Sequence, residues 1–154
     1  MIAATLDILR EPRGEAYAAL LALAAERCAT FSLVWPDRLS ASVGADTVAV
    51  SLSLDLVREA RVSQWPGTQL LDDTARVRHY ALTPDSLAVL RSAPGLYAWH
   101  GPSRPEDLAF YTADGSLWMG SVAHESDAWF TAAAMAADDL PARLPLLELG
   151  ARRL

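Results

Sequence analysis

The sequence contains no lysine, no asparagine and only two isoleucines, so all 13 of its basic residues are arginine. These three amino acids use AT-rich codons, and their scarcity is typical of a GC-rich bacterial genome. The absence of lysine and asparagine also excludes several catalytic arrangements. Without lysine there is no Schiff-base nucleophile and no P-loop lysine to bind a phosphate. Without asparagine a Cys-His-Asn catalytic arrangement is excluded.

Cysteine is almost absent as well, since Cys28 is the only one. A single cysteine excludes an internal disulfide framework and a cysteine-based zinc site, which favours a reducing compartment. The apolar run Ala16–Ala25 is too short to span a bilayer, and the Glu26-Arg27 pair that follows it is unlike a signal-peptide cleavage site. We therefore expect a core helix and a cytoplasmic protein.

The net charge of −6 gives little support to a nucleic-acid or anionic-membrane partner, because both need a basic face. It is compatible with a protein partner, including a basic one. A length of 154 residues predicts one domain over 1–154, with a tail from about residue 141 that packs less tightly.

The first half of the chain predicts one helix followed by one strand. Apolar residues spaced as on one helix face run from Glu15 to Cys28, and Thr30–Trp35 is typical of a strand that ends at Pro36. From Val48 to Leu56 apolar residues alternate as in a strand, although Leu52–Leu56 could instead end a helix. The choice between helix and strand at 44–56 stays open.

The second half contains the clearest turn signals. Thr74–Leu82 alternates and can pair antiparallel with the segment before Trp65. Thr83-Pro84-Asp85 predicts a helix start. Leu108–Tyr111 and Leu117–Ala123 flank Asp114-Gly115, which predicts a hairpin. Residues 128–137 fit either a helix or the start of a strand.

Catalytic motifs are missing. The phosphate-binding glycine patterns, the GxSxG elbow and the HExxH zinc pattern do not occur, and the three histidines stand apart. We predict neither a metal site nor a cofactor. The best catalytic candidates are His124 and Glu125, beside the predicted hairpin, although a polar strand end explains them more simply. His79 is likewise more typical of a hydrogen-bonded core histidine than of a ligand or base.

Five tryptophans and one strand face are candidates for binding. Trp65, Trp99 and Trp118 could line a small-ligand pocket, and tryptophans at loop edges also anchor protein interfaces, although core packing is their usual role. In the predicted register Arg76, Arg78 and Tyr80 share one face of a strand. That face is either solvated or part of an interface.

The order of three segments, RCATFSLVW, VSQWPGTQLL and LYAWHGPSRPEDLAFYTADGSLWMGSVAHE, resembles a family of small bacterial proteins. Members sometimes carry the label "stage III sporulation protein AH". The resemblance implies a bacterial, cytoplasmic α+β protein with a helix at 44–56, and it supplies no catalytic residues. The label itself implies a membrane anchor, and this sequence contains no spanning segment, so we do not transfer that function.

Together these observations predict an α+β fold in which two or more helices cover one face of an antiparallel sheet of four or five strands. The predicted core consists of Leu20, Leu21, Ala24, Phe31, Leu33, Val62, Val77, Leu87, Leu90, Leu108, Phe110, Trp118 and Val122. The expected function is a non-catalytic protein-binding module, such as an immunity-like or regulatory partner. Two alternatives are a small hydrolase or transferase that uses His124 and Glu125, and a domain that binds a small ligand.

Overall fold

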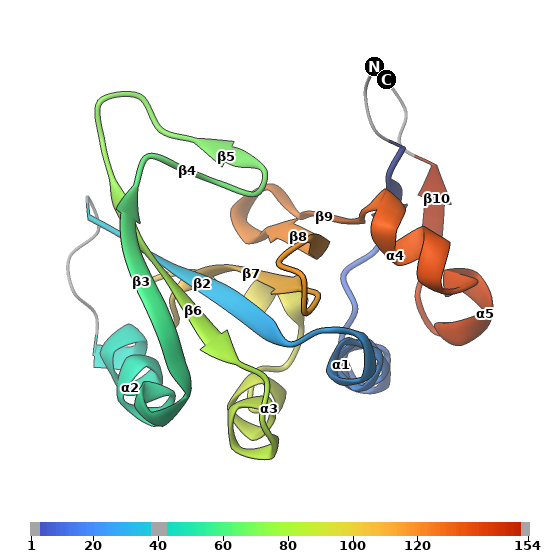
Figure 1. Cartoon of the computed structure of the whole chain (residues 1–154), viewed down its shortest axis with the longest axis horizontal. Coiled ribbons are helices and arrows are strands. Elements are labelled where there is room, and N and C mark those ends of the chain that lie inside the picture. Colours follow the sequence, from blue (N-terminus) through green and yellow to red (C-terminus); the bar gives the residue numbers. More distant parts are fainter. Residues whose placement is uncertain (1–3, 38–42, 152–154) are drawn as a thin grey trace.

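The computed structural model describes residues 4–37 and 43–151 and contains one large antiparallel sheet (Figure 1). Its eight strands follow the order β10-β1-β9-β8-β7-β2-β6-β3. Their bounds are Leu6–Ile8 (β1), Thr30–Pro36 (β2), Leu56–Val62 (β3), Ala75–Ala81 (β6), Glu106–Tyr111 (β7), Leu117–Val122 (β8), Asp127–Phe130 (β9) and Leu149–Ala151 (β10). Gln64–Trp65 (β4) and Thr68–Gln69 (β5) form a separate small hairpin.

Five α-helices accompany the sheet in the described residues. They are Gly14–Arg27 (α1), Val43–Ser51 (α2), Pro84–Arg91 (α3), Ala132–Ala137 (α4) and Leu140–Arg143 (α5). Short 3-10 turns occupy Ser53–Asp55 (η1), Leu96–Ala98 (η2) and Ala123–Glu125 (η3). Helices α1, α2 and α3 lie on one side of the sheet, and the β4–β5 hairpin lies on the other (Figure 1). We call these sides the helix face and the hairpin face.

The predicted α+β class with an antiparallel sheet is confirmed, but four or five strands were too few. The additional strands are β1, β9 and β10, which have only three or four residues each. Strand β9 lies where the sequence left a helix or the start of a strand open, Leu6 and Ile8 in β1 alternate as in a short strand, and β10 gave no signal of its own. Segments of that length are defined mainly by their distant pairing partners. None of the described helices has both the length and the apolar character that crossing a bilayer requires.

Local sequence explains the predicted elements that formed. Tyr17, Leu20 and Leu21 are buried on one face of α1, as their spacing predicts. Helix α3 begins with a capping box, in which the Thr83 side chain accepts from the Ser86 backbone N–H and the Ser86 side chain accepts from the Thr83 backbone N–H. In the β7–β8 turn Gly115 has a φ of +88°, which glycine adopts without a steric penalty.

The structure assigns a secondary structure to the segments that the sequence left undecided. Residues 43–51 are helical and β3 begins only at Leu56, so the alternation from Val48 to Leu54 does not belong to a strand. Residues 127–130 form β9, and a helix follows at 132–137 with Thr131 as its N-cap. At the C-terminal end Leu144 is buried and β10 pairs with β1, so the described part of the segment after residue 141 is integrated in the fold.

The core has two parts. The larger cluster packs α1 and α3 against the helix face, and a smaller one on the hairpin face contains Val34, Ala75 and Val77. Every predicted core residue is buried except Val62, which is half-buried against the smaller cluster. Because the smaller cluster has only three buried residues, it leaves much of the β3 end of the sheet exposed. The candidate surface described next lies at that end.

Candidate binding surface

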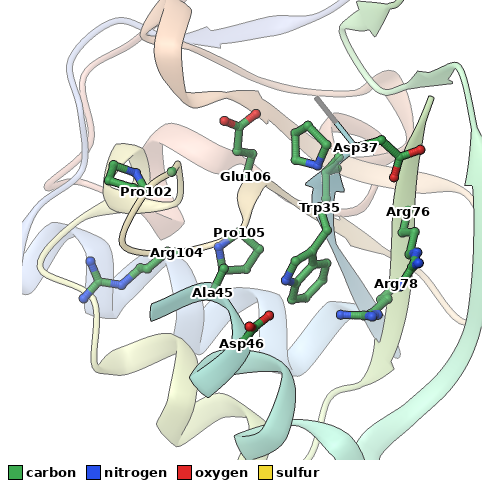
Figure 2. A pocket seen from close by; sticks show the side chains of 13 residues that line it. Trp35, Asp37, Ala45, Asp46, Arg76, Arg78, Pro102, Arg104, Pro105 and Glu106 are labelled. Carbon is green, nitrogen blue, oxygen red and sulfur yellow. The ribbon is translucent and has the colours of Figure 1, made fainter. Parts of the chain in front are cut away.

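A cavity of about 630 Å³, called the main cavity, lies beside β2 and β6 toward the β3 end of the sheet. Figure 2 shows the side chains that line it. Four segments of the chain form its walls. They are the end of β2, the start of α2, Arg76 and Arg78 of β6, and the loop that leads into β7. The lining side chains include Trp35, Asp37, Asp46, Arg76, Arg78, Pro102, Arg104, Pro105 and Glu106.

Strand pairing places the arginines on the cavity wall. In the β2–β6 ladder Trp35 is opposite Arg76, Leu33 is opposite Arg78 and Phe31 is opposite Tyr80. Directly opposed residues share a face of the sheet, so the predicted common face of Arg76, Arg78 and Tyr80 is confirmed. Tyr80 differs from the two arginines because it is buried in the core behind them.

The start of α2 approaches the loop that carries the prolines. A Cβ atom at Gly44 would collide with the backbone carbonyl of Ser103. Glycine therefore allows the helix to lie against this loop, where Ala45 is buried. This contact closes one side of the cavity and fixes Asp46 on its rim.

Ion pairs occupy some of the charged groups around the cavity. The Arg78 guanidinium donates to Glu59 at 2.9 Å and lies 4.4 Å from the centroid of the Trp35 ring. Arg61 pairs with Asp37 at 2.7 Å. Among the described residues Arg76 has no carboxylate partner. The Trp35 Nε1–H is buried and has no hydrogen-bond acceptor among them either.

Beside the cavity, β3 forms the edge of the sheet. No described strand pairs with its outer side, and most of its side chains are exposed. Exposed apolar side chains lie at its beginning, in the preceding turn and on α2: Leu56 is 44%, Val57 59%, Leu54 98%, Val50 74% and Val43 86% exposed. These five residues together with the outer edge of β3 are called the α2–β3 surface. Such an exposed group of large apolar side chains is typical of an interaction site.

On the hairpin face Arg58 of β3 lies beside His79. The Arg58 Nη2 atom is 3.4 Å from the His79 Nε2 atom, and the His79 ring packs 5.1 Å from the Tyr111 ring. Burial, assisted by the Arg58 charge, lowers the pKa of His79 to about 4. The imidazole is therefore neutral near pH 7, and Arg58 has no carboxylate partner among the described residues.

The candidate catalytic pair lies elsewhere. Strand β8 ends at Val122, so His124 and Glu125 sit in the η3 turn, where both are exposed and their Nε2 and Oε1 atoms are 3.8 Å apart. Neither residue lines the main cavity. Their exposure gives no sign of the desolvated, oriented setting that proton transfer usually requires.

The three candidate tryptophans are not brought together. Trp99 and Trp118 are fully buried in the large core cluster, and Trp99 donates to the Tyr17 hydroxyl at 2.9 Å. Trp65 packs against the small cluster and donates to the buried Asp107 carboxylate at 2.8 Å. The tryptophan that does line the main cavity is Trp35. Its position before Pro36 marked it as an edge residue, but no local signal connected it with Arg76.

The described residues contain neither a cluster of metal ligands nor a reactive thiol. They contain no group of three or more histidine, cysteine, aspartate or glutamate residues that could hold a metal ion. Burial raises the pKa of the Cys28 thiol to about 12, so it is protonated and inert near pH 7.

Comparison with known proteins adds no relatives. No family model, no curated protein and no solved structure matches the chain. The function therefore has to be argued from the cavity and the α2–β3 surface.

Proposed function

We propose that this protein is a non-catalytic binding module that captures an extended segment of a partner protein along β3. The observation that carries the proposal is an exposed seven-residue edge strand that adjoins exposed apolar side chains. Unpaired backbone groups at a sheet edge can accept an added strand, which is a common mode of peptide recognition.

The charged side chains near β3 indicate which partner segment would bind there. Arg58 and Arg76 both lack a carboxylate partner among the described residues, one on each face of the sheet at this end. A segment that alternates apolar and acidic side chains would match these arginines and the apolar side chains of Leu56 and Val57. A basic partner agrees with the net charge of −6, but the charges next to β3 favour an acidic one.

The enzymatic alternative has less support. A hydrolase or transferase based on His124 and Glu125 would work from an exposed turn outside the main cavity. A bacterial cytoplasmic setting and an immunity-like or regulatory role also remain parts of the proposal. They rest on composition and on the sequence resemblance.

Selection of peptides from a random display library tests the proposal, with the intact protein as bait. We expect enrichment of segments that alternate apolar and acidic residues, and loss of their binding to the Leu54→Asp and Arg58→Glu variants. Two matched controls should keep it: Leu71→Asp changes another exposed leucine, and Arg10→Glu changes an exposed arginine near the opposite end of the sheet. Enrichment without such a pattern, or binding equally strong to all four variants, would refute the proposal.

A further inference from the structure

The regular part of β3 runs along the outer edge of the sheet from Arg58 to Val62, because a register shift separates Leu56 from Arg58 (Figure 1). No described strand covers that edge. Two identical edge strands join antiparallel about a two-fold axis perpendicular to the sheet, which keeps the two helix faces on the same side. Residues that lie opposite each other in such a pair therefore belong to the same face.

The charges of β3 favour one register for a pair of identical strands. With Ala60 at the two-fold axis, Glu59 of each copy lies opposite Arg61 of the other, and Arg58 lies opposite Val62. An axis at Arg58, Glu59 or Arg61 would instead place two identical charges directly opposite each other, which is destabilising. The Ala60 register thus makes opposite charges meet twice.

Glu59 and Arg61 are placed to make these contacts. Glu59 is opposite Arg78 on the helix face, and Arg61, two residues further along the strand, shares that face. Each has an ion pair within its own chain, Glu59 with Arg78 at 2.9 Å and Arg61 with Asp37 at 2.7 Å, yet their side chains remain 40% and 55% exposed. A second copy would join these ion pairs into an alternating network, which stabilises more than isolated surface pairs do.

From these features we infer that two copies of this chain pair through β3 in the Ala60 register and form a symmetric dimer. The paired strands are short and their ion pairs are exposed, so the dimer dissociates on dilution. A dimer has no free β3 edge, and a partner segment then binds only to the separated chain. Self-association thereby regulates partner capture; this consequence rests on the proposed function, whereas the pairing itself does not.

Charge reversal tests the register on the intact protein. Analytical ultracentrifugation should show a monomer–dimer equilibrium for the wild type. In Glu59→Arg the new side chain faces an arginine of the other copy, and in Arg61→Glu it faces a glutamate, so each variant should self-associate at least roughly tenfold more weakly. An equimolar mixture of the two variants should dimerise again, because both cross-strand pairs then join opposite charges. The ion pair that each variant loses within its own chain cannot explain this recovery.

A cysteine at the two-fold axis tests the same register without reversing a charge. Cys28, the native cysteine, is buried, so an added thiol on β3 is the one that reacts. Ala60→Cys should form an interchain disulfide under mild oxidation, because side chains directly opposite each other lie within reach of one. Arg58→Cys is the matched control and should not, because Val62 lies opposite it. A disulfide in the control alone, or a wild type that is monomeric at millimolar concentration, would overturn the inference.

Arg58→Glu separates this inference from the proposed function. The variant should still dimerise, because residue 58 lies opposite Val62, although it should lose the library-selected peptide. Adding that peptide to the wild type should convert the dimer into monomeric complexes, and a dimer that binds peptide without separating would overturn the regulatory inference. A chain that captures the peptide but never dimerises would overturn self-association alone. Dimerisation without peptide capture would refute the proposed function and leave the pairing of β3 in place.

Discussion

The hydroxyl of Tyr17 links two buried groups of the core. It donates to the Leu90 carbonyl at 2.6 Å and accepts from the Trp99 indole N–H at 2.9 Å. Tyr17 is 3% exposed and Trp99 is fully buried. Replacing Tyr17 with phenylalanine keeps the ring and removes both bonds, so the Trp99 N–H loses its acceptor in a site that water does not reach.

The cost of Tyr17→Phe follows from those two bonds. A buried neutral hydrogen bond contributes about 1 kcal/mol, and an unpaired buried donor costs about 1–3 kcal/mol. We expect the free energy of unfolding to fall by about 2–3 kcal/mol. For a domain of this size the corresponding fall in Tm is roughly 5–10 °C. Urea denaturation followed by far-UV circular dichroism measures the change.

Tyr97 provides a matched control, because its hydroxyl is buried but has no hydrogen-bond partner among the described residues. Tyr97→Phe should therefore leave stability unchanged or raise it slightly. Equal destabilisation by the two substitutions would refute the reasoning. Burial raises the pKa of each tyrosine to about 12, so the unfolded state releases the hydroxyl proton more readily and the free energy of unfolding should fall as the pH rises from about 10 to 12.

Three further outcomes are expected. Arg58→Gln should raise the pKa of His79 from about 4, but not to 6.5 because burial, the larger cause, remains; an NMR titration with an unchanged pKa would contradict this. Gly120→Ala should destabilise the fold by about 1–3 kcal/mol in thermal unfolding, because the new Cβ would lie 2.6 Å from a buried indole ring; an unchanged Tm would argue against that packing. Asp107→Asn should lower the free energy of unfolding by about 2 kcal/mol in urea denaturation, because the two Asp107 carboxylate oxygens each accept an N–H bond and the amide keeps only one oxygen. The exposed substitution Asp72→Asn should have little effect, and equal effects of the two would count against this reasoning.

The pKa of His79 predicts how the stability of the fold changes with pH below neutrality. Because the pKa of His79 is lowered in the folded state, the unfolded state binds the proton more readily between about pH 6.5 and pH 4. Stability should therefore fall as the pH falls through that window. The half-buried ring is partly screened by solvent, which keeps the contribution to roughly 1–2 kcal/mol.

Much of the fold could be predicted because its signals are local. The helix face of α1, the capping box of α3 and the Asp-Gly turn all lie within short stretches of sequence. The alternation at 48–56 left helix and strand open because small and apolar residues also suit a helix that is mostly exposed. Leu52 alone among its leucines is fully buried, and only tertiary packing reveals that.

The candidate site was predictable only in part. Arg76 and Arg78 were found because the strand period places them on one face. Their connection with Trp35, Asp46 and Pro105 depends on four segments that are distant in the sequence. No spacing rule relates such segments, and the strand order that brings them together is a property of the whole sheet.

Amide hydrogen exchange on β3 tests the central claim most directly. A library-selected apolar and acidic peptide should slow exchange at the outward-facing amides of Leu56–Val62, with little change at β10, the opposite edge of the sheet. A scrambled peptide of the same composition should leave β3 unchanged. Protection located on another element, or a bound peptide that leaves β3 exchange unaltered, would contradict strand addition at this edge.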